Sequence, residues 1–294
     1  MAAVSMFAGV AQAGFLMVPD SDATSGERLM LFDAFDGSLV DPNFIDLNPL
    51  DAFLPKHAMQ VGNEIWLSDQ VRNRIDRFNL AGSHLSAITE AAPGQPLSNI
   101  RGMGIVGNEL YVTNEGTTDG APGNALVGYD FSGNHVQNVP TAQTSPFDVL
   151  VYRNEVLVSH SSAADIQRYD LDLNHIGPFH VGAISFVQQM HERSNGNLLA
   201  IGSFGTSGIY EFDPSGAPTG FFVPVSNVPR GIWELGNGNL MYTNNQGVWV
   251  HDIATGGSTM IEAASAQYID FLIPTPGAAA VFALAGLAAY RRRR

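Results

Sequence analysis

Glu64-Ile-Trp-Leu-Ser68 is the first of five similar segments that recur at a nearly constant interval along the chain. The others are Glu109-Leu-Tyr-Val-Thr113, Glu155-Val-Leu-Val-Ser159, Asn197-Leu-Leu-Ala-Ile201 and Asn239-Leu-Met-Tyr-Thr243. Counted from Ile65, Leu110, Val156, Leu198 and Leu240, the steps are 45, 46, 42 and 42 residues. Each segment is a short apolar run, as expected of a β-strand. A repeat of this length built from short strands predicts the blades of a β-propeller.

A second pattern follows each of these strands and gives the number of blades. A strand that ends beside an Asp or Asn recurs as Leu31-Phe-Asp33, Arg77-Phe-Asn79, Gly128-Tyr-Asp130, Arg168-Tyr-Asp170, Glu211-Phe-Asp213 and Val250-His-Asp252. A glycine follows in five of the six copies, at Gly37, Gly82, Gly133, Gly216 and Gly256. Glycine suits a tight turn because it adopts positive φ without steric cost. Six copies predict six blades.

The expected order of strands places one blade at the junction of the two ends of the propeller. Five blades are complete, at roughly 55–95, 98–142, 144–184, 185–225 and 227–264. The remaining blade has three strands near the N-terminus, Phe15–Val18, Arg28–Phe35 and Ser38–Ile45. We expect Gln267–Ile273 to supply its inner strand, because an open ring would leave exposed sheet edges. The sequence therefore predicts an all-β, six-bladed propeller over residues 14–273, closed by N- and C-terminal strands.

Three further segments carry a family resemblance. Asn73-Arg-Ile-Asp-Arg-Phe78, Asp165-Ile-Gln-Arg-Tyr-Asp170 and Pro229-Arg-Gly-Ile232 resemble the NHL and related six-bladed propellers of exported bacterial proteins. The resemblance spans most of residues 15–273 and is a pattern of strands. It implies the fold, and it carries no function with it.

Composition excludes several classes of function. The formal net charge is −14 and the chain contains no cysteine. We expect no nucleic acid partner, because binding to phosphates needs a basic surface. The lack of cysteine excludes disulfides, thiolate metal sites and cysteine nucleophiles.

The last 22 residues, Ile273 to Arg294, read IPTPGAAAVFALAGLAAYRRRR. Pro274 and Pro276 end any preceding strand, and Ala278 to Tyr290 predict a short hydrophobic helix. Such a helix would be about 20 Å long, against roughly 30 Å for the hydrocarbon core of a membrane. The four arginines that follow would remain on the cytoplasmic side.

This tail, residues 274–294, resembles the PEP-CTERM sorting signal of Gram-negative bacteria. The resemblance rests on Pro274, Thr275, Pro276, Gly277, Arg291, Arg292, Arg293 and Arg294, with Thr275 in place of the usual Glu. It implies recognition by an exosortase, transient anchoring in the inner membrane, and delivery to the cell surface or extracellular matrix. An ordinary tail anchor is the alternative.

The opposite end, residues 1–13, predicts a signal peptide. The segment is apolar and ends in Ala11-Gln12-Ala13, the small-residue pattern that signal peptidase accepts. It lacks the usual positive charge, since no Lys or Arg precedes Arg28. A first core strand is the alternative.

A ring of cations is expected at one mouth of the central channel. Aligning the repeats back from Gly62, Gly107, Arg153 and Gly236 places Lys56, Arg101, Phe147 and Arg230 in one equivalent position. His57, Asp148, Gln188 and Asp270 lie close by in the same register. In an otherwise acidic protein, a positive mouth would suit an anionic ligand such as a uronic-acid polysaccharide or a phosphate. The alternative is that these residues form salt bridges between neighbouring blades.

Two functions remain open. The leading interpretation is a non-enzymatic exported propeller, without a cofactor or metal, that binds an extracellular polysaccharide or a surface protein. The alternative is a secreted hydrolase or lactonase, because gluconolactonases and strictosidine synthase-like enzymes resemble this ring in architecture. That resemblance implies a divalent metal, and Asp148, Asn99, Asn244 and Asp270 offer the oxygens that Ca²⁺ prefers.

Overall fold

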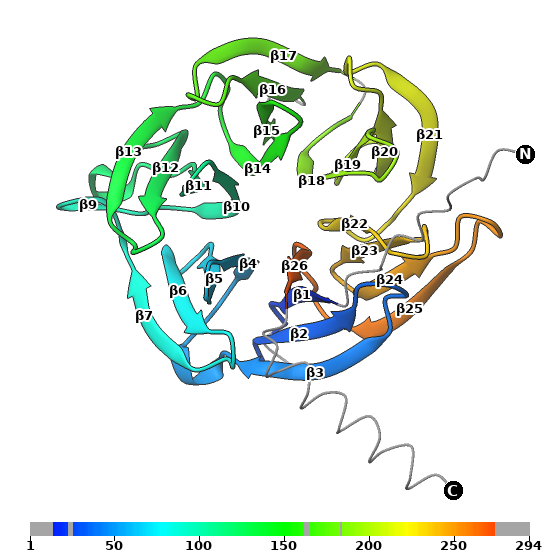
Figure 1. The fold of residues 1–294 in the computed structure, drawn as a ribbon, viewed down its shortest axis with the longest axis horizontal. Coiled ribbons are helices and arrows are strands. Elements are labelled where there is room, and N and C mark those ends of the chain that lie inside the picture. Colours follow the sequence, from blue (N-terminus) through cyan, green and yellow to red (C-terminus); the bar gives the residue numbers. More distant parts are fainter. Residues whose placement is uncertain (1–13, 23–25, 162–164, 183, 274–294) are drawn as a thin grey trace, which may run out of the picture.

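The computed structural model describes residues 14–22, 26–161, 165–182 and 184–273. Its strands form six four-stranded antiparallel sheets arranged as blades around a central channel (Figure 1). The predicted all-β, six-bladed propeller is therefore confirmed. The predicted signal peptide, sorting motif and hydrophobic C-terminal helix lie outside the described residues.

Each blade begins with an inner strand at the channel. The first contains, in spatial order, β26 (Asp270–Leu272), β1 (Phe15–Asp20), β2 (Arg28–Asp33) and β3 (Leu39–Asp46). The second contains β4 (Pro55–Val61), β5 (Glu64–Asp69), β6 (Arg74–Asn79) and β7 (His84–Ile88). The third contains β10 (Ile100–Val106), β11 (Glu109–Asn114), β12 (Ala125–Asp130) and β13 (His135–Pro140).

The other three blades repeat this order. The fourth contains β14 (Pro146–Tyr152), β15 (Glu155–His160), β16 (Asp165–Tyr169) and β17 (His175–Val181). The fifth contains β18 (Val187–Glu192), β19 (Leu198–Gly202), β20 (Gly208–Phe212) and β21 (Pro218–Pro224). The sixth contains β22 (Ile232–Glu234), β23 (Leu240–Asn244), β24 (Gly247–His251) and β25 (Ser258–Ala263). Smaller elements are the hairpin of β8 (Glu90–Ala92) with β9 (Gln95–Pro96), and 3₁₀ turns at Asn48–Leu50 and Thr118–Gly120.

In the first blade, β26 pairs antiparallel with β1, and Leu272 lies opposite Phe15. The regular strand covers three residues, fewer than the seven of the expected Gln267–Ile273. The reason lies in the hydrogen bond of Tyr268, whose backbone N–H donates to the Lys56 carbonyl of the second blade at 3.1 Å.

The recurring Asp or Asn caps the hairpin between the third and fourth strands of each blade. In the third blade, Asp130 Oδ1 accepts backbone N–H bonds from Ser132 and Asn134, both at 2.9 Å. These bonds and that of the Asn134 side chain lower the pKa of Asp130. Gly133 takes φ 91°, as the turn requires. The blade without a glycine places Leu173 there, with φ 63°.

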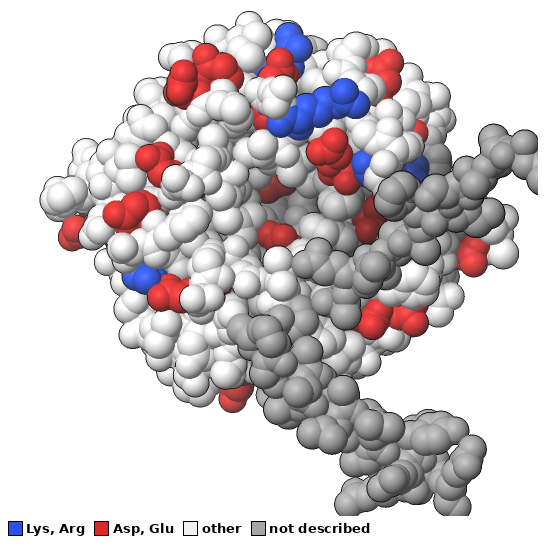
Figure 2. Space-filling model, viewed as in Figure 1, with Lys and Arg blue, Asp and Glu red and all other residues white. Residues whose placement is uncertain are grey.

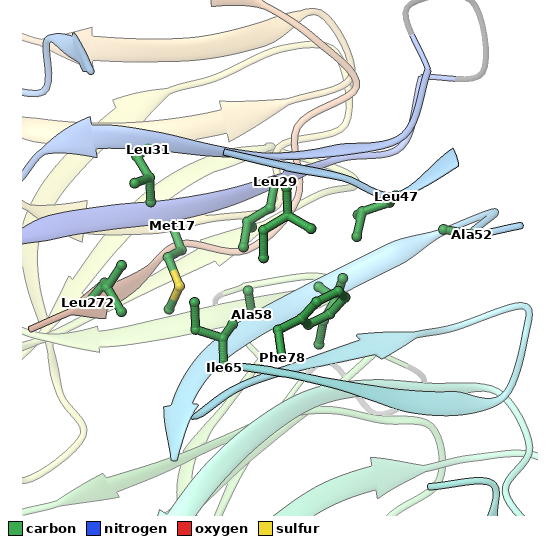
Figure 3. Packing of buried hydrophobic residues seen from close by; sticks show 11 residues of the cluster. Met17, Leu29, Leu31, Leu47, Ala52, Ala58, Ile65, Phe78 and Leu272 are labelled. Atoms are coloured by element: carbon green, nitrogen blue, oxygen red, sulfur yellow. The ribbon is translucent and has the colours of Figure 1, made fainter. Parts of the chain in front are cut away.

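Apolar side chains fill the space between neighbouring blades. Between the first and second blades, Met17 and Leu29 pack against Ala58, Ile65 and others (Figure 3). Fully burying a side chain of this size stabilises the fold by roughly 1.5–3 kcal/mol. The interior thus holds each blade to its neighbours and fixes the inner strands around the channel.

A row of hydroxyl groups joins the blades nearer the channel. Ser68 Oγ donates to the Arg101 carbonyl at 2.6 Å, and Ser159 Oγ donates to the Gln188 carbonyl at 2.8 Å. Thr243 Oγ1 makes the same bond to the Gln267 carbonyl at 2.5 Å. Each bond runs from a second strand to the start of the inner strand in the next blade. With the bond of Thr113 Oγ1 to the Phe147 carbonyl, the same contact recurs at four junctions between blades and aligns their inner segments.

Among the residues that the structure describes, no helix is long and apolar enough to cross a membrane.

Candidate functional site

The hydroxyl bonds and the strand pairing define which residues are equivalent around the channel. The first set, here called the channel ring, consists of Lys56, Arg101, Phe147, Gln188, Arg230 and Gln267. The next residue in each blade forms a second ring of His57, Gly102, Asp148, Gln189, Gly231 and Tyr268. The predicted equivalence of Lys56, Arg101, Phe147 and Arg230 matches the first set. Gln188 belongs with these four, whereas Asp270 lies two residues beyond the second ring.

Lys56 lies inside the protein rather than at an open mouth, with 4% of its surface exposed. Its ammonium donates to Gln188 Oε1 at 2.9 Å and to Gln267 Oε1 at 3.0 Å. It also lies 4.4 Å from the centre of the Tyr268 ring. Burial, reinforced by Arg230 and Arg101, holds the pKa of Lys56 well below its usual range. This amine is therefore held by partners within the channel.

The two arginines of the channel ring are also held by protein groups. Arg101 donates to Ser145 Oγ and the Pro146 carbonyl, each at 3.0 Å, and pairs with Glu115 at 3.0 Å. Its guanidinium lies 3.9 Å from the centre of the Phe147 ring. Arg230 donates to Ser265 Oγ at 3.0 Å. The hydrogen bonds of Arg101 to Ser145 and Pro146 join the third and fourth blades, whereas its ion pair with Glu115 lies within the third blade.

A cavity of about 270 Å³ opens on one face of the channel. Its lining includes three members of the second ring, His57, Asp148 and Gln189, and residues further along the inner strands: Met59, Leu150, His191, Glu192, Trp233 and Asp270. No channel-ring residue lines it. Figure 2 shows a hollow at the centre of this face with acidic side chains inside it. Of the residues predicted to bind a ligand at the channel mouth, the structure thus brings His57, Asp148 and Asp270 to the cavity.

Asp148 is the most unusual group of the cavity. Its Oδ2 accepts the backbone N–H of Met190 at 2.9 Å, while its Oδ1 is buried without a hydrogen-bond partner among the described residues. Burial raises the pKa of Asp148 to about 7, against the lowering effects of His57 and of the backbone N–H groups of Met190 and Val149. Gly102 makes room for this oxygen, since an added Cβ would lie 2.6 Å from Oδ1. This oxygen is buried beside Gly102 in the wall of the cavity, where a water or a ligand donor would satisfy it.

His57 is fixed in one tautomer. Its Nδ1 accepts the backbone N–H of Met103 at 2.9 Å, so this nitrogen carries no proton. The ring proton lies on Nε2, which is 3.3 Å from Asp270 Oδ2. The Nε2 of His57 thus faces a carboxylate at the edge of the cavity, but it makes no hydrogen bond among the described residues.

Aromatic rings form one side of the cavity. Trp233 packs against His191 with ring centres 4.2 Å apart and planes tilted by 37°, and it lies parallel to Phe271 at 6.3 Å. Burial lowers the pKa of His191 to about 4, so this imidazole is uncharged at neutral pH. The cavity therefore combines an apolar ring surface with the carboxylates of Asp148, Glu192 and Asp270.

The oxygens proposed for a metal do not converge. Asn244 Oδ1 already accepts bonds from Gln246 N at 2.9 Å and Gly247 N at 3.0 Å in a turn. Asn99 bonds to Gln70 at 2.8 Å and to Glu115. In the described part of the chain, no group of three or more His, Cys, Asp or Glu side chains is placed to hold a metal ion. The residues present do not fit the Ca²⁺ site of the enzymatic alternative.

Sequence reasoning missed several residues of the site, namely Gln189, Tyr268, His191, Glu192 and Trp233. The sequence does contain a usable signal, the Ser or Thr near the end of most second strands. Counting the register from that hydroxyl, rather than from the hairpin, places Gln267 in the channel ring. It places Tyr268 beside His57 and Asp148 in the second ring.

No protein-family model and no curated protein sequence matches the chain. Solved structures do match. A nidogen/laminin complex chain has a TM-score of 0.69 at 13% identity and covers 88% of this chain and 98% of its own length. A Bacteroides uniformis protein assigned as a 6-phosphogluconolactonase has a TM-score of 0.60 at 12% identity, covering 89% and 100%. Streptogramin B lyase has a TM-score of 0.54 at 15% identity, covering 76% and 70%. At these identities the likeness establishes the propeller fold alone, shared by proteins of diverse function.

Proposed function

We propose that this chain is an exported surface or matrix protein that binds a saccharide in the cavity at the mouth of its propeller channel. The observation that carries the proposal is the pairing of the Trp233 wall with the carboxylates of Asp148 and Asp270 in one concave site. An aromatic face suits the apolar side of a sugar ring, and carboxylates accept bonds from its hydroxyls.

The size of the cavity supports a glycan rather than a protein as the occupant. At about 270 Å³ it suits a ring or two of a chain molecule. A stable protein interface buries roughly 800 Å² on each partner, which a hollow of this kind does not provide by itself.

The binding proposal is tested by calorimetric titration of a panel of neutral, acidic and basic oligosaccharides. We expect at least one class to bind, and Trp233→Ala to weaken that binding at least tenfold. Phe131→Ala is the matched control, because Phe131 is an exposed aromatic residue that does not line the cavity. Unchanged binding by a folded Trp233→Ala variant would remove the support for this site.

The route to the surface rests on the two ends of the sequence. Residues 1–13 would direct export and be removed by signal peptidase, and residues 274–294 would be read by an exosortase after transient insertion in the inner membrane. We infer that the pairing of β26 with β1 closes the ring. Release at Pro274-Thr-Pro276 would then leave every strand of the propeller in place. Fractionation of cells with the intact chain and with Arg291–Arg294 deleted tests this route. The same location and size for both proteins would contradict it.

One observation favours a second candidate, an enzyme of the hydrolase or lactonase type. Asp148 has an open oxygen, and its pKa of about 7 suits a group that gives or takes a proton at neutral pH. Turnover of a lactone or oligosaccharide that is lost in Asp148→Asn, with binding retained, would favour catalysis over binding alone.

A further inference from the structure

The charge around the cavity is strongly one-sided. Asp148, Glu192 and Asp270 line it, and no Lys or Arg of the described part of the chain does. Of its two histidines, His191 adds no positive charge at neutral pH because its pKa is lowered to about 4, and His57 accepts the Met103 N–H at Nδ1. The cations of the channel ring are bonded to protein groups and do not line the cavity. The charged groups that a ligand in this cavity contacts are therefore acidic side chains.

The unpartnered Oδ1 of Asp148 favours a ligand that supplies a hydrogen-bond donor. Asp148 is 2% exposed, and its Oδ1 has no partner among the described residues. A buried acceptor without a donor is unfavourable, so a ligand that donates there gains more than it would at the surface. An ammonium group offers three donors and a positive charge, whereas a hydroxyl offers one donor and no charge.

From this arrangement we infer that the saccharide carries a protonated amino group, which the carboxylates of Asp148 and Asp270 bind. The ligand class is thus an amino sugar with a free amine, whose ring stacks on Trp233. The inference rests on the proposed function and specifies its ligand. It differs from the expectation of a uronic-acid polysaccharide or phosphate, whose charge would be repelled by the carboxylates of Glu192 and Asp270 and by the ionised form of Asp148.

A matched pair of probes tests the inference. The glucosamine trimer and the N-acetylglucosamine trimer share a backbone, and the second has amides where the first has amines. At pH 7 and low salt we expect the amine trimer to bind at least tenfold more tightly. Raising the salt concentration should weaken that binding and leave the acetylated trimer unaffected, because salt screens charge.

Variants of the carboxylates complete the test. Asp148→Asn and Asp270→Asn should each reduce the preference for the amine trimer at least fivefold. Asp119→Asn, which changes an exposed carboxylate on a distant loop, should leave it unchanged. Equal or tighter binding of the acetylated trimer would overturn the inference while the proposed function stands. If neither trimer nor any other oligosaccharide binds, the proposed function itself fails.

Discussion

The ammonium of Lys56 lies 2.9 Å from Oε1 of Gln188, a residue of the blade on the opposite side of the ring (Figure 1). The bond spans the channel, and a second bond to Gln267 anchors the same amine to the first blade. The channel is therefore closed at this level by a side chain. The cavity above it is a blind site that is open on one face, which is the form of a binding pocket rather than of a passage.

The reactivity of Lys56 checks this closure. Lys56 is the only lysine of the sequence, so acylation of an ε-amine reports on this residue alone. Because it is 4% exposed, we expect acylation at pH 8 to be at least tenfold slower in the native protein than in urea. Mass spectrometry of the peptide that contains Lys56 measures the rate. Equal rates in the two states would mean that the channel is open to solvent at Lys56.

Asp148 should make the stability of the empty protein depend on pH. Its folded-state pKa of about 7 lies above the unfolded value of about 3.9. Its contribution to stability is therefore full below pH 4 and is lost as the pH rises through 7. Between pH 5 and pH 8 the natural chain should therefore lose about 3 kcal/mol in free energy of unfolding through Asp148. Asp148→Asn has no proton to lose at this position, so its free energy of unfolding should not show that loss.

Urea unfolding of both proteins at the two pH values measures this difference. An unchanged difference between the two proteins from pH 5 to pH 8 would show that Asp148 is ionised throughout, as a solvated carboxyl would be.

Gln189 holds three blades together through its amide. Its Oε1 accepts from the backbone N–H groups of Ile232 at 3.1 Å and Ile269 at 3.0 Å, and its Nε2 donates to the Ile269 carbonyl at 2.6 Å. Gln189→Leu leaves these buried groups without partners, and we expect a loss of about 2–4 kcal/mol in the free energy of unfolding. Gln143→Leu, at an exposed position, should change it by less than about 0.5 kcal/mol. Equal effects of the two substitutions would refute this role.

The last strand should be needed for the fold, whereas the residues after it should not. A chain that ends at Ile273 keeps β26 paired with β1 and should unfold cooperatively. A chain that ends at Ile269 lacks Leu272, a buried residue between the first and second blades whose loss alone costs about 2–5 kcal/mol. Thermal unfolding of the two chains compares them. A similar Tm for both would show that β26 does not stabilise the ring.

The candidate site could be predicted only in part. The repeat aligned Lys56, Arg101 and Arg230 correctly, because strand position follows from spacing. It could not show that Lys56 reaches Gln188 across the channel, because the two are 132 positions apart and meet only when six blades form a ring. For the same reason, the cations of the channel ring were expected to meet the ligand, whereas Asp148 and Asp270 line the cavity.

The sequence by itself determined the six-bladed fold. The apolar strand Glu64–Ser68 and the hairpin capped by an Asp or Asn, as at Asp130, are local features, and both recur along the chain at a nearly fixed interval. Only the tertiary structure decided the sign of the charge in the cavity. Lys56 and Asp148 belong to adjacent rings of the same channel. Lys56 is buried and bonded to protein groups and does not line the cavity, whereas Asp148 lines it and has one oxygen without a hydrogen-bond partner among the described residues. Which charged side chain contacts the ligand depends on how deep each one lies along the channel axis. The spacing of residues in the sequence does not give that depth.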